Sequence, residues 1–485
     1  MLQNIEPQIV WKHFESLNAV PRPSKKEERV IQFMLDFGKG LNLETLKDDA
    51  GNVIIKKPAS KGFENRKTVV LQSHLDMVHQ KNENTDFNFE KEGIKMYVED
   101  DWVKAKGTTL GADNGLGVAS IMSILSADNI EHPAIEALFT IDEETGMTGA
   151  KNLDPDILKG EILLNLDTEE DDEIGIGCAG GTDITATRFY IEESIPENTT
   201  AFKLNIKGLQ GGHSGMDIIK GLGNANTLMI RFLLQFHKKC TMRLGSFNGG
   251  GLRNAIPRES SASFVISNQD LEAFKSVLED LSQAIHSEYK TLEPNLDIQL
   301  KETAAPKSVL SSDVQDMIIK ALSTAHNGVY RMSPDIENLV ETSNNIAQVT
   351  IEKGKIQILC LTRSSVESGK WHLAHSIESA FDLAGCKVEF SGDYPGWTPN
   401  PDSAILKVVD ELYQKNFGEK ATIAACHAGL ECGILGSHYP EMDMVSFGPT
   451  IRGAHSPDER ASISSTQKFW AFLKDILKNI PEKDS

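Results

Sequence analysis

His74 and Asp76 are the first residues in the chain whose types and spacing could do chemistry. They follow an apolar run at positions 69–71, in a stretch long enough for a buried strand. Because side chains alternate faces along an extended chain, both residues point the same way. An imidazole binds zinc through one nitrogen, and a neighbouring carboxylate can hold the other nitrogen and fix the ring. A hydrogen-bonded pair at the surface would have the same sequence, so both interpretations stay open for this pair alone.

Asp113 is a second candidate, in the middle of the glycine-rich segment 107–117. An apolar helix is predicted directly after this segment, from Val118 to Ala127. Glycine-rich loops that open a helix can bind phosphate, but the spacing is not G-x-G-x-x-G and a carboxylate would repel a phosphate. Asp113 could cap the helix, or it could bind a cation where glycines let the backbone bend tightly. The residue types alone do not separate these two roles.

Two further predicted strands end on acidic residues. The segment 134–140 leads into the acidic run 142–144, and the segment 161–166 ends on Asp167. In open α/β sheets, ligands collect at the carboxyl ends of the strands. Solvated loop charges could explain one such ending, but they explain the whole series poorly. The pattern therefore favours a metal site at one edge of a sheet.

Together these positions offer the nitrogen and oxygen ligands of a metal pair. Two imidazoles and several carboxylates suit two zinc ions, for which Co²⁺ or Mn²⁺ could substitute. One carboxylate can bridge two metals about 4 Å apart, and a carboxylate that binds no metal can act as a base toward water. The neighbours Glu143 and Glu144 could supply both roles, because adjacent side chains project differently. The candidates are His74, Asp113, Glu143, Glu144, Asp167 and His455.

Composition limits the kind of protein that positions these residues. The chain has 485 residues and a net charge of −21, which predicts two domains and argues against a broad basic face for nucleic acid or anionic membranes. No apolar run reaches about 18 residues, so no membrane span is expected. The N-terminal residues lack the pattern of a signal peptide. The six cysteines contain no Cys-x-x-Cys pair, which is typical of reduced thiols in a cytoplasmic protein.

The order of the predicted elements changes twice along the chain. Between residues 187 and 393 the elements suggest helices packed on an antiparallel sheet. After residue 393 the pattern of elements resembles the first part of the chain again, with a helix at 403–417 and a strand at 443–447. We therefore expect a catalytic domain, 1–186 and 394–485, that is interrupted by an inserted lid domain, 187–393. The element order repeats within the lid, which could mark two lobes.

The motifs resemble those of the co-catalytic di-zinc aminoacylase/carboxypeptidase-type metallopeptidases. They keep the order of that family and cover both predicted domains. The resemblance implies an α/β fold: a di-zinc aminopeptidase-like catalytic domain, with a mixed sheet flanked by helices, interrupted by an α+β lid domain. The matching positions are 73–76, 111–115, 142–146, 165–167, 211–215 and His455.

The resemblance also implies which residue holds which metal. His74 and Asp167 would hold one zinc ion. Glu144 and His455 would hold the other. Asp113 would bridge the two ions, and a non-proline cis peptide bond would follow it.

The remaining roles implied by the resemblance concern catalysis and substrate binding. Asp76 would hold the ring of the first histidine ligand, and Glu143 would be the general base that takes a proton from the water bridging the metals, which leaves a metal-bridging hydroxide. In the lid, His213 would polarise the scissile carbonyl or stabilise the oxyanion. Asn254 and Arg363 would bind the free carboxylate of the substrate, the arginine by its planar fork. Without the resemblance, the glycines around His213 could form only a turn, and Asn254 could be a cap.

The function implied is a zinc-dependent dipeptidase with two Zn²⁺ per chain. Segments 253–259 and 427–433 are similar to a branch of the family that prefers a C-terminal histidine, carnosine-like substrates included. An aminotripeptidase or an N-acyl amino acid deacylase is the alternative within the family. A non-catalytic peptide- or metal-binding protein is a third hypothesis, but the presence of Glu143 favours an enzyme. We expect small peptide substrates, a cytoplasmic location, no nucleic-acid or membrane partner, and a homodimer formed through the lid.

Overall fold

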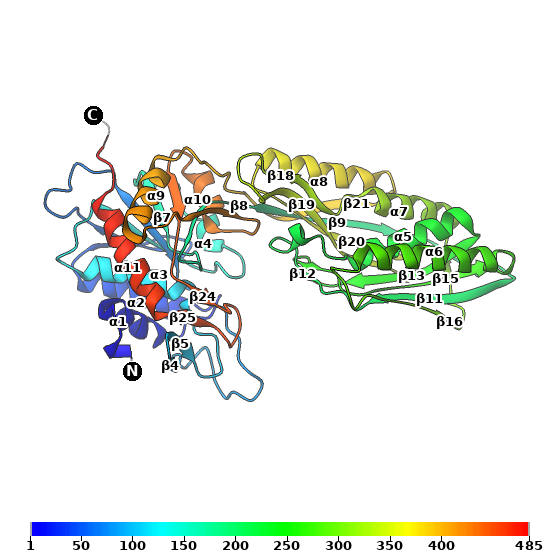
Figure 1. Cartoon of the computed structure of the whole chain (residues 1–485), viewed down its shortest axis with the longest axis horizontal. Coiled ribbons are helices and arrows are strands. Elements are labelled where there is room, and N and C mark those ends of the chain that lie inside the picture. The colour runs from blue at the N-terminus through cyan, green and yellow to red at the C-terminus, as the bar shows by residue number, and fades with distance from the viewer. Residues whose placement is uncertain (1, 484–485) are drawn as a thin grey trace. The chain divides into compact units, whose positions relative to one another are not determined.

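The computed structural model describes residues 2–483, which form two compact units (Figure 1). The expected domain boundaries at 187 and 393 fall inside two strands, β9 (Gly180–Phe189) and β21 (Lys387–Tyr394), that belong to one sheet. The division therefore comes at residues 178 and 398 instead. Unit 1 contains residues 2–177, 399–425 and 430–483, and unit 2 contains residues 178–398 and 426–429.

Unit 1 is built on a mixed sheet, in which the described residues contribute eight strands. Strand β3 runs parallel to β6 and β7, and β7 runs parallel to β23, so the carboxyl ends of these strands meet at one edge. Every residue of β3, β6 and β7 is buried, which explains their continuous apolar runs. The strand order is β1 (Glu44–Lys47), β2 (Val53–Lys57), β6 (Ile135–Thr140), β3 (Val69–His74), β7 (Ile162–Asn165), β23 (Asp443–Ser446), β8 (Glu173–Cys178) and β22 (Thr422–Cys426).

The helices of unit 1 pack on this sheet and on one another. α3 contacts β3, α2 contacts β1 and β2, and α9 contacts β23, while α1 covers α3 and α11 covers α9. The helical spacing of Val10, Phe14 and Leu17 buries one face of α1. The helices are α1 (Gln8–Asn18), α2 (Glu28–Gly40), α3 (Ala112–Ser126), α4 (Thr148–Lys151), α9 (Ala404–Phe417), α10 (Glu431–His438) and α11 (Ile463–Lys478).

The start of α3 differs from the prediction. The helix expected from Val118 begins at Ala112, but Asp113 and Asn114 have non-helical backbone angles. The peptide bond between these two residues is cis, as the family resemblance implied. The helix therefore begins with an irregular turn that presents the Asp113 side chain.

A small sheet joins two distant parts of unit 1. Strands β24 (Ile451–Arg452) and β25 (Arg460–Ser462) pair antiparallel, and β25 pairs with β5 (Trp102–Ala105). β5 in turn pairs with β4 (Met96–Glu99), as the lower part of Figure 1 shows. The loop between β24 and β25 carries His455, so the pairing fixes both ends of that loop.

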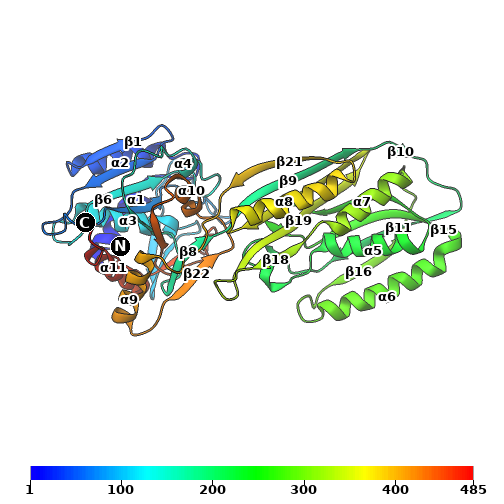
Figure 2. The ribbon, with the colours of Figure 1, turned by 90° about the horizontal axis from the view of Figure 1, so that it is seen from above.

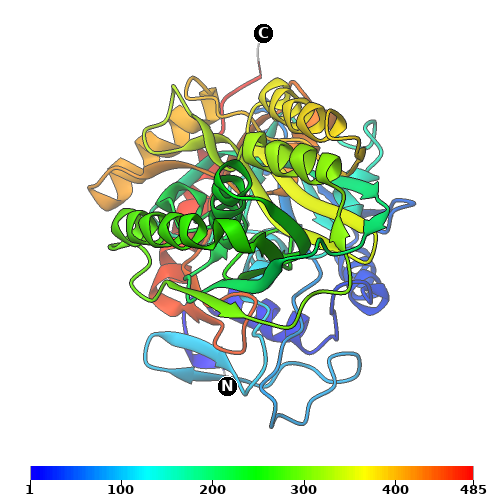
Figure 3. The same ribbon diagram turned by 90° about the vertical axis from the view of Figure 1, so that its right-hand side faces the viewer.

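The large sheet of unit 2 is antiparallel and has helices on one face. Helices α5 (Ala225–Lys239), α6 (Leu271–Tyr289), α7 (Ser312–Thr324) and α8 (Glu367–Asp382) lie in front of the strands in Figure 2, and the view of Figure 3 shows them gathered on one side. The two lobes suggested by the repeated element order share this single sheet. Its order is β16 (Asp297–Glu302), β11 (Thr199–Lys207), β15 (Ser260–Ser267), β13 (Met242–Gly250), β19 (Val340–Glu352), β20 (Lys355–Ser364), β9 and β21, with β18 (Gly328–Met332) also paired to β19.

Alternation along β11 shows how the sequence positions this sheet. Phe202, Leu204 and Ile206 are buried in the core under the helices, whereas Lys203 on the opposite face is exposed. This period of two is typical of a sheet with one covered face. The α+β lid and the mixed catalytic sheet are thus as predicted, and within residues 2–483 no helix is long and apolar enough to cross a membrane. The short paired strands are β10 (Glu192–Glu193) with β17 (Val309–Leu310), and β12 (Gly212–His213) with β14 (Ala255–Ile256).

Candidate active site

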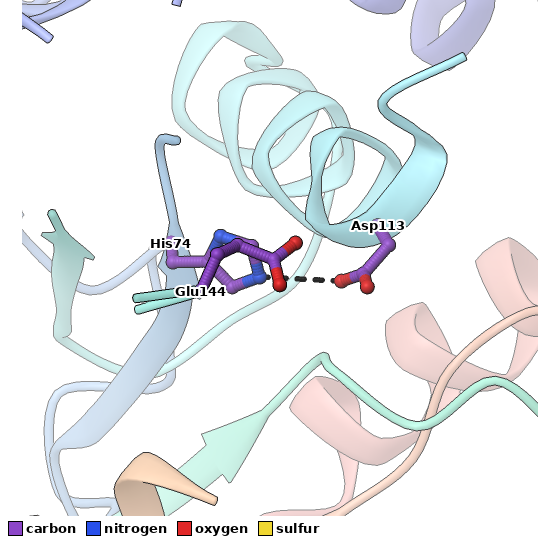
Figure 4. Close-up of side chains that lie close together, drawn as sticks. All are labelled: His74, Asp113 and Glu144. Carbon is purple, nitrogen blue, oxygen red and sulfur yellow. Dashed lines mark hydrogen bonds and ion pairs between the residues drawn. The ribbon is translucent and has the colours of Figure 1, made fainter. Parts of the chain in front are cut away.

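The predicted metal ligands gather at the carboxyl edge of the unit 1 sheet. His74 is the last residue of β3, Asp167 follows β7, and Glu144 lies in the turn after β6. Asp113 comes from the irregular start of α3, and His455 comes from the β24–β25 loop. Figure 4 shows His74, Asp113 and Glu144 close together, with the Asp113 carboxylate facing the imidazole of His74. The five side chains thus come from separate elements whose ends meet.

Asp113 lies between the two imidazoles. Its Oδ1 is 3.2 Å from Nε2 of His74, and its Oδ2 is 3.2 Å from Nε2 of His455. His74 Nε2 also lies 3.6 Å from Asp167 Oδ1, and His455 Nε2 lies 3.0 Å from Glu144 Oε2. Each histidine therefore has one carboxylate of its own and shares Asp113 with the other. Such an arrangement could hold two cations, with Asp113 as a bridging carboxylate.

The acidic groups of the site fit divalent cations. Among the described residues, Glu144 Oε1 and Asp167 Oδ1 are buried without a hydrogen-bond partner, and a buried charge in that state is costly. Burial raises the pKa of Asp167 well above its ordinary value, and the charges of Asp113 and Glu143 add to this. Imidazoles and carboxylates are ligands that Zn²⁺, Co²⁺ and Mn²⁺ accept. A pair of such ions would satisfy these oxygens.

The two histidines compensate part of the negative charge. Burial lowers the pKa of His74, but Asp167, Asp113 and Asp76 outweigh it and raise the pKa well above the ordinary value. Hydrogen bonds with Asp113 and Glu144 raise the pKa of His455 to about 11. Protons on these imidazoles balance the carboxylates, and a metal ion that binds here must displace them.

Asp76 organises the site from behind the histidine. Its Oδ1 lies 3.4 Å from Nδ1 of His74, and its backbone carbonyl lies 3.2 Å from the same nitrogen. The backbone N–H of Glu143 donates to Oδ1 at 3.0 Å, that of Glu144 donates to Oδ2 at 3.3 Å, and the Ser24 hydroxyl donates to Oδ2 at 2.8 Å. Asp76 therefore holds both the histidine ring and the turn that follows β6, a second contact that the sequence did not suggest.

Glu143 shares that turn with Glu144 but makes none of the described ligand contacts. Burial raises its pKa well above the ordinary value, and Glu431 and Glu144 contribute although His74 opposes them. Asp142 shapes the turn: its backbone φ is 53°, and the Thr148 hydroxyl donates to Oδ2 at 2.7 Å. A buried carboxyl group with a raised pKa can take up a proton and give it back.

Sequence reasoning missed three buried charged residues that surround the site: Arg22, Glu431 and Glu459. Glu431 lies behind the strand ends, where Thr140 Oγ1 and Gln72 Nε2 both donate to its Oε2 at 2.5 and 2.7 Å. Burial raises the pKa of Glu431 to about 7. In the sequence, only its place in the glycine-rich segment 427–433 indicated a special role for Glu431.

The predicted substrate-binding residues all lie in unit 2. His213 is in β12, whose pairing with β14 places it opposite Ala255, next to Asn254. The N–H groups of Gly215 and Met216 donate to His213 Nδ1 at 3.2 and 3.1 Å. Burial lowers the pKa of His213, so the neutral ring carries its proton on Nε2 and can donate from that atom.

Arg363 and His427 belong to the same part of unit 2. Arg363, in β20, donates from Nη1 to the hydroxyl of Tyr394 at 2.9 Å, and its charge helps to lower the pKa of His213. His427 is buried, and its Nε2 lies 2.7 Å from the Ser343 hydroxyl. Burial and the charge of Arg363 lower its pKa to about 3. Unit 2 therefore presents an arginine among neutral imidazoles.

Comparisons with known proteins find similar sequences and structures over nearly the whole chain. The model of peptidase family M20/M25/M40 matches residues 70–479. A cytosol non-specific dipeptidase of Escherichia coli is 44% identical over 482 residues, 99% of this chain and 99% of the relative. The crystal structure of an aminoacylhistidine dipeptidase from Vibrio alginolyticus superposes with a TM-score of 0.95 at 43% identity, covering 100% of this chain and 99% of that one.

A more distant structure shares only the fold. The aminopeptidase PepT of Bacillus cereus matches with a TM-score of 0.57 at 17% identity, over 98% of this chain and 99% of that chain. The similarity is therefore strong over the full length for two dipeptidases and limited to architecture for this aminopeptidase.

Proposed function

The chain belongs to peptidase family M20/M25/M40, and we propose that it is a dipeptidase whose unit 1 holds two zinc ions. The observation that carries this proposal is the position of Asp113, which has one oxygen toward each of two imidazoles. His74 and Asp167 would hold one ion, and Glu144 and His455 would hold the other. Co²⁺ or Mn²⁺ could replace zinc, because the same ligands suit them.

The residues of unit 1 divide the work of peptide hydrolysis. Cations held by these ligands would supply Lewis acidity toward the scissile carbonyl and would lower the pKa of water. Glu143 takes a proton from the attacking water and passes it to the leaving amine, which its raised pKa allows. Asp76 keeps the His74 ring and the Glu143 backbone in fixed positions through the hydrogen bonds described above.

The residues of unit 2 bind the substrate in this proposal. The N–H at Nε2 of His213 donates to the oxygen of the scissile carbonyl, where negative charge develops. Arg363 binds the C-terminal carboxylate by its planar guanidinium group, with Asn254 as a second donor. The hydrogen bond between Arg363 and Tyr394 supports this role, because it limits the conformations of the guanidinium group.

We also propose a preference for dipeptides that end in histidine, carnosine-like substrates included. The names of the two similar dipeptidases differ on this point, since one is called aminoacylhistidine and the other non-specific. The cytosol in the name of the relative supports a cytoplasmic location. Pairing of two chains through unit 2 stays part of the proposal.

The test is hydrolysis of Gly-His by the unchanged protein and by Glu143→Gln, with metal content measured on the same samples. We expect about two metals per chain in both and a loss of turnover of about 10²–10⁴-fold in the variant. Glu83→Gln, the same change at an exposed position, is the control. Full activity in Glu143→Gln would remove this residue from the mechanism.

A substrate panel separates the alternatives within the family. Gly-His, Gly-Leu, a tripeptide and an N-acetyl amino acid should be compared at equal concentration. Highest turnover of Gly-His would support the histidine preference, and equal turnover of Gly-Leu would remove it. Faster hydrolysis of the N-acetyl substrate would replace the dipeptidase proposal by a deacylase.

A further inference from the structure

Two buried side chains of opposite charge lie on either side of the loop that carries Asp113. Glu459 comes from the same β24–β25 loop as His455, and Arg22 follows α1 in the chain. Their exposed fractions are 2% and 1%. Neither is a predicted metal ligand, base or substrate-binding residue, so the mechanism above leaves both unexplained.

Glu459 binds the start of α3 through four consecutive backbone N–H groups. Those of Leu110 and Gly111 donate to Oε2 at 2.6 and 2.8 Å. Those of Ala112 and Asp113 donate to Oε1 at 2.7 and 3.2 Å. The first N–H groups of a helix have no partner within it, and a negative charge there also interacts favourably with the helix dipole. Glu459 thus fixes the backbone of Asp113 itself.

Arg22 joins the same loop to the end of β3. Its Nη1 donates to the carbonyls of Leu75 and Asp76, each at 3.0 Å. Its Nη2 donates to the Gly111 carbonyl at 2.6 Å and to Asn18 Oδ1 at 3.0 Å. A Cβ atom at position 111 would lie 2.6 Å from Nη2, and the φ of this residue is +70°. The close approach of the guanidinium therefore requires a glycine there.

We propose that Glu459 and Arg22 are positioning residues that together set where Asp113 stands relative to the two histidines. Arg22 ties the Asp113 loop to the strand that ends at His74. Glu459 ties the same loop to the segment that carries His455. Hydrogen bonds to these two side chains thereby connect the segments that carry His74, Asp113 and His455. This inference rests on the proposed function, because it takes these ligands to bind metal.

The charge of Glu459 helps to stabilise the buried guanidinium of Arg22. Burial lowers the pKa of Arg22 to about 10, and the charge of Glu459 is the largest of those that oppose this effect. Burial raises the pKa of Glu459 to about 7, and the backbone N–H groups of the loop oppose it. Buried charges persist when they are hydrogen-bonded and compensated. Removing either one should disturb the other and the loop between them.

The test is a Co²⁺ titration of Glu459→Gln, followed by visible absorption, together with Gly-His kinetics. In glutamine an NH₂ group replaces one carboxylate oxygen and cannot accept the N–H groups of the loop. Asp113 would be a ligand of both cations, so we expect both affinities to fall by about 10–100-fold, the usual effect of losing an outer partner of a ligand. kcat should fall while KM changes little, and Glu83→Gln should behave like the unchanged protein.

The outcomes separate this inference from the proposed function. An unchanged protein that binds no Co²⁺ would refute the ligand assignment itself. Two ions bound by the unchanged protein, with the same affinities and spectrum in Glu459→Gln, would overturn the positioning role, even if the variant melts at a lower temperature. If Glu459→Gln does not fold, Arg22→Lys decides, because it keeps the charge but loses the planar fork. We expect about tenfold weaker binding in that variant, and unchanged binding would overturn the inference.

Discussion

The buried carboxyl group of Glu431 allows a quantitative test of the electrostatics behind the active site. Both of its hydrogen-bond donors, from Thr140 and Gln72, approach Oε2, and Oε1 has no partner among the described residues. Burial therefore raises its pKa from 4.5 to about 7. Glu431→Gln keeps the shape and one acceptor oxygen for the two donors but removes the titrating group.

The size of the effect follows from the two pKa values. Between pH 4.5 and about 7 the folded protein keeps a proton on Glu431 that the unfolded chain has released. Because the unfolded state binds fewer protons in this range, the free energy of unfolding falls as the pH rises. At about 1.4 kcal/mol per pH unit, the total loss is about 3 kcal/mol. The Glu431→Gln variant lacks the titrating group and does not lose this stability. Its free energy of unfolding should therefore rise, relative to that of the unchanged protein, by up to about 3 kcal/mol as the pH rises.

Urea unfolding in the presence of a chelator, at several pH values from about 4.5 to 8, measures this difference directly. The buried Trp11 and Trp470 of unit 1 provide a fluorescence signal for its unfolding. Glu83→Gln, at an exposed position, should show no such pH dependence. A stability difference that does not change with pH would refute the raised pKa. A variant that loses stability as the pH rises would mean that Glu431 is ionised and stabilised by its two donors.

Three further predictions concern the metals, the packing of α3 and the substrate. The pKa values of His74 and His455 are raised, to about 11 for the latter, so protons compete with metal ions for these nitrogens. The metal affinity should therefore fall as the pH is lowered. A titration in weak buffer that detects no proton release on metal binding would contradict this prediction. Gly117→Ala would put a Cβ atom 2.8 Å from the Leu166 carbonyl oxygen; the free energy of unfolding, measured by urea denaturation, should fall by about 1–3 kcal/mol, and an unchanged value would show that the helix can shift freely. Arg363→Gln should raise KM for Gly-His by about 10–100-fold, as the loss of a charged hydrogen bond predicts, without changing metal content; if a dipeptide amide, which lacks the carboxylate, shows the same increase, Arg363 does not bind that group.

The candidate ligands at the strand ends were predictable because the residues next to them in the sequence indicate the strand. A buried parallel strand has a continuous apolar run, and His74 and Asp167 are conspicuous where two such runs stop. The partners of these residues were not predictable in the same way. Glu459 accepts a hydrogen bond from Leu110, 349 positions away in the chain, and no pattern around either residue indicates it. Glu459 and Arg22 are important because of hydrogen bonds that form only in the folded chain, and such contacts between distant residues are a tertiary property.

The domain boundary near residue 187 was misplaced for a physical reason. The composition changes where β9 ends, because exposed residues such as Ile191 follow the strand. The chain enters unit 2 earlier, at Cys178, where the backbone continues from β8 almost directly into β9. The chain is extended both before and after residue 178, in β8 and β9, so the sequence shows no change of element at this point. Composition therefore marks the end of the strand and not the end of the unit.

The discontinuous construction of unit 1 has a consequence for biosynthesis. Residues up to 177 contain four of the five proposed ligands, but His455 and Glu459 are translated only after the whole of unit 2. At about 5–20 residues per second, the ribosome needs many seconds to add the segment that completes the metal pair. A nascent chain would therefore leave its acidic strand ends without their last partners during that time. We therefore expect a chain that stops before residue 455 to lack hydrolase activity, because it has no fifth proposed ligand.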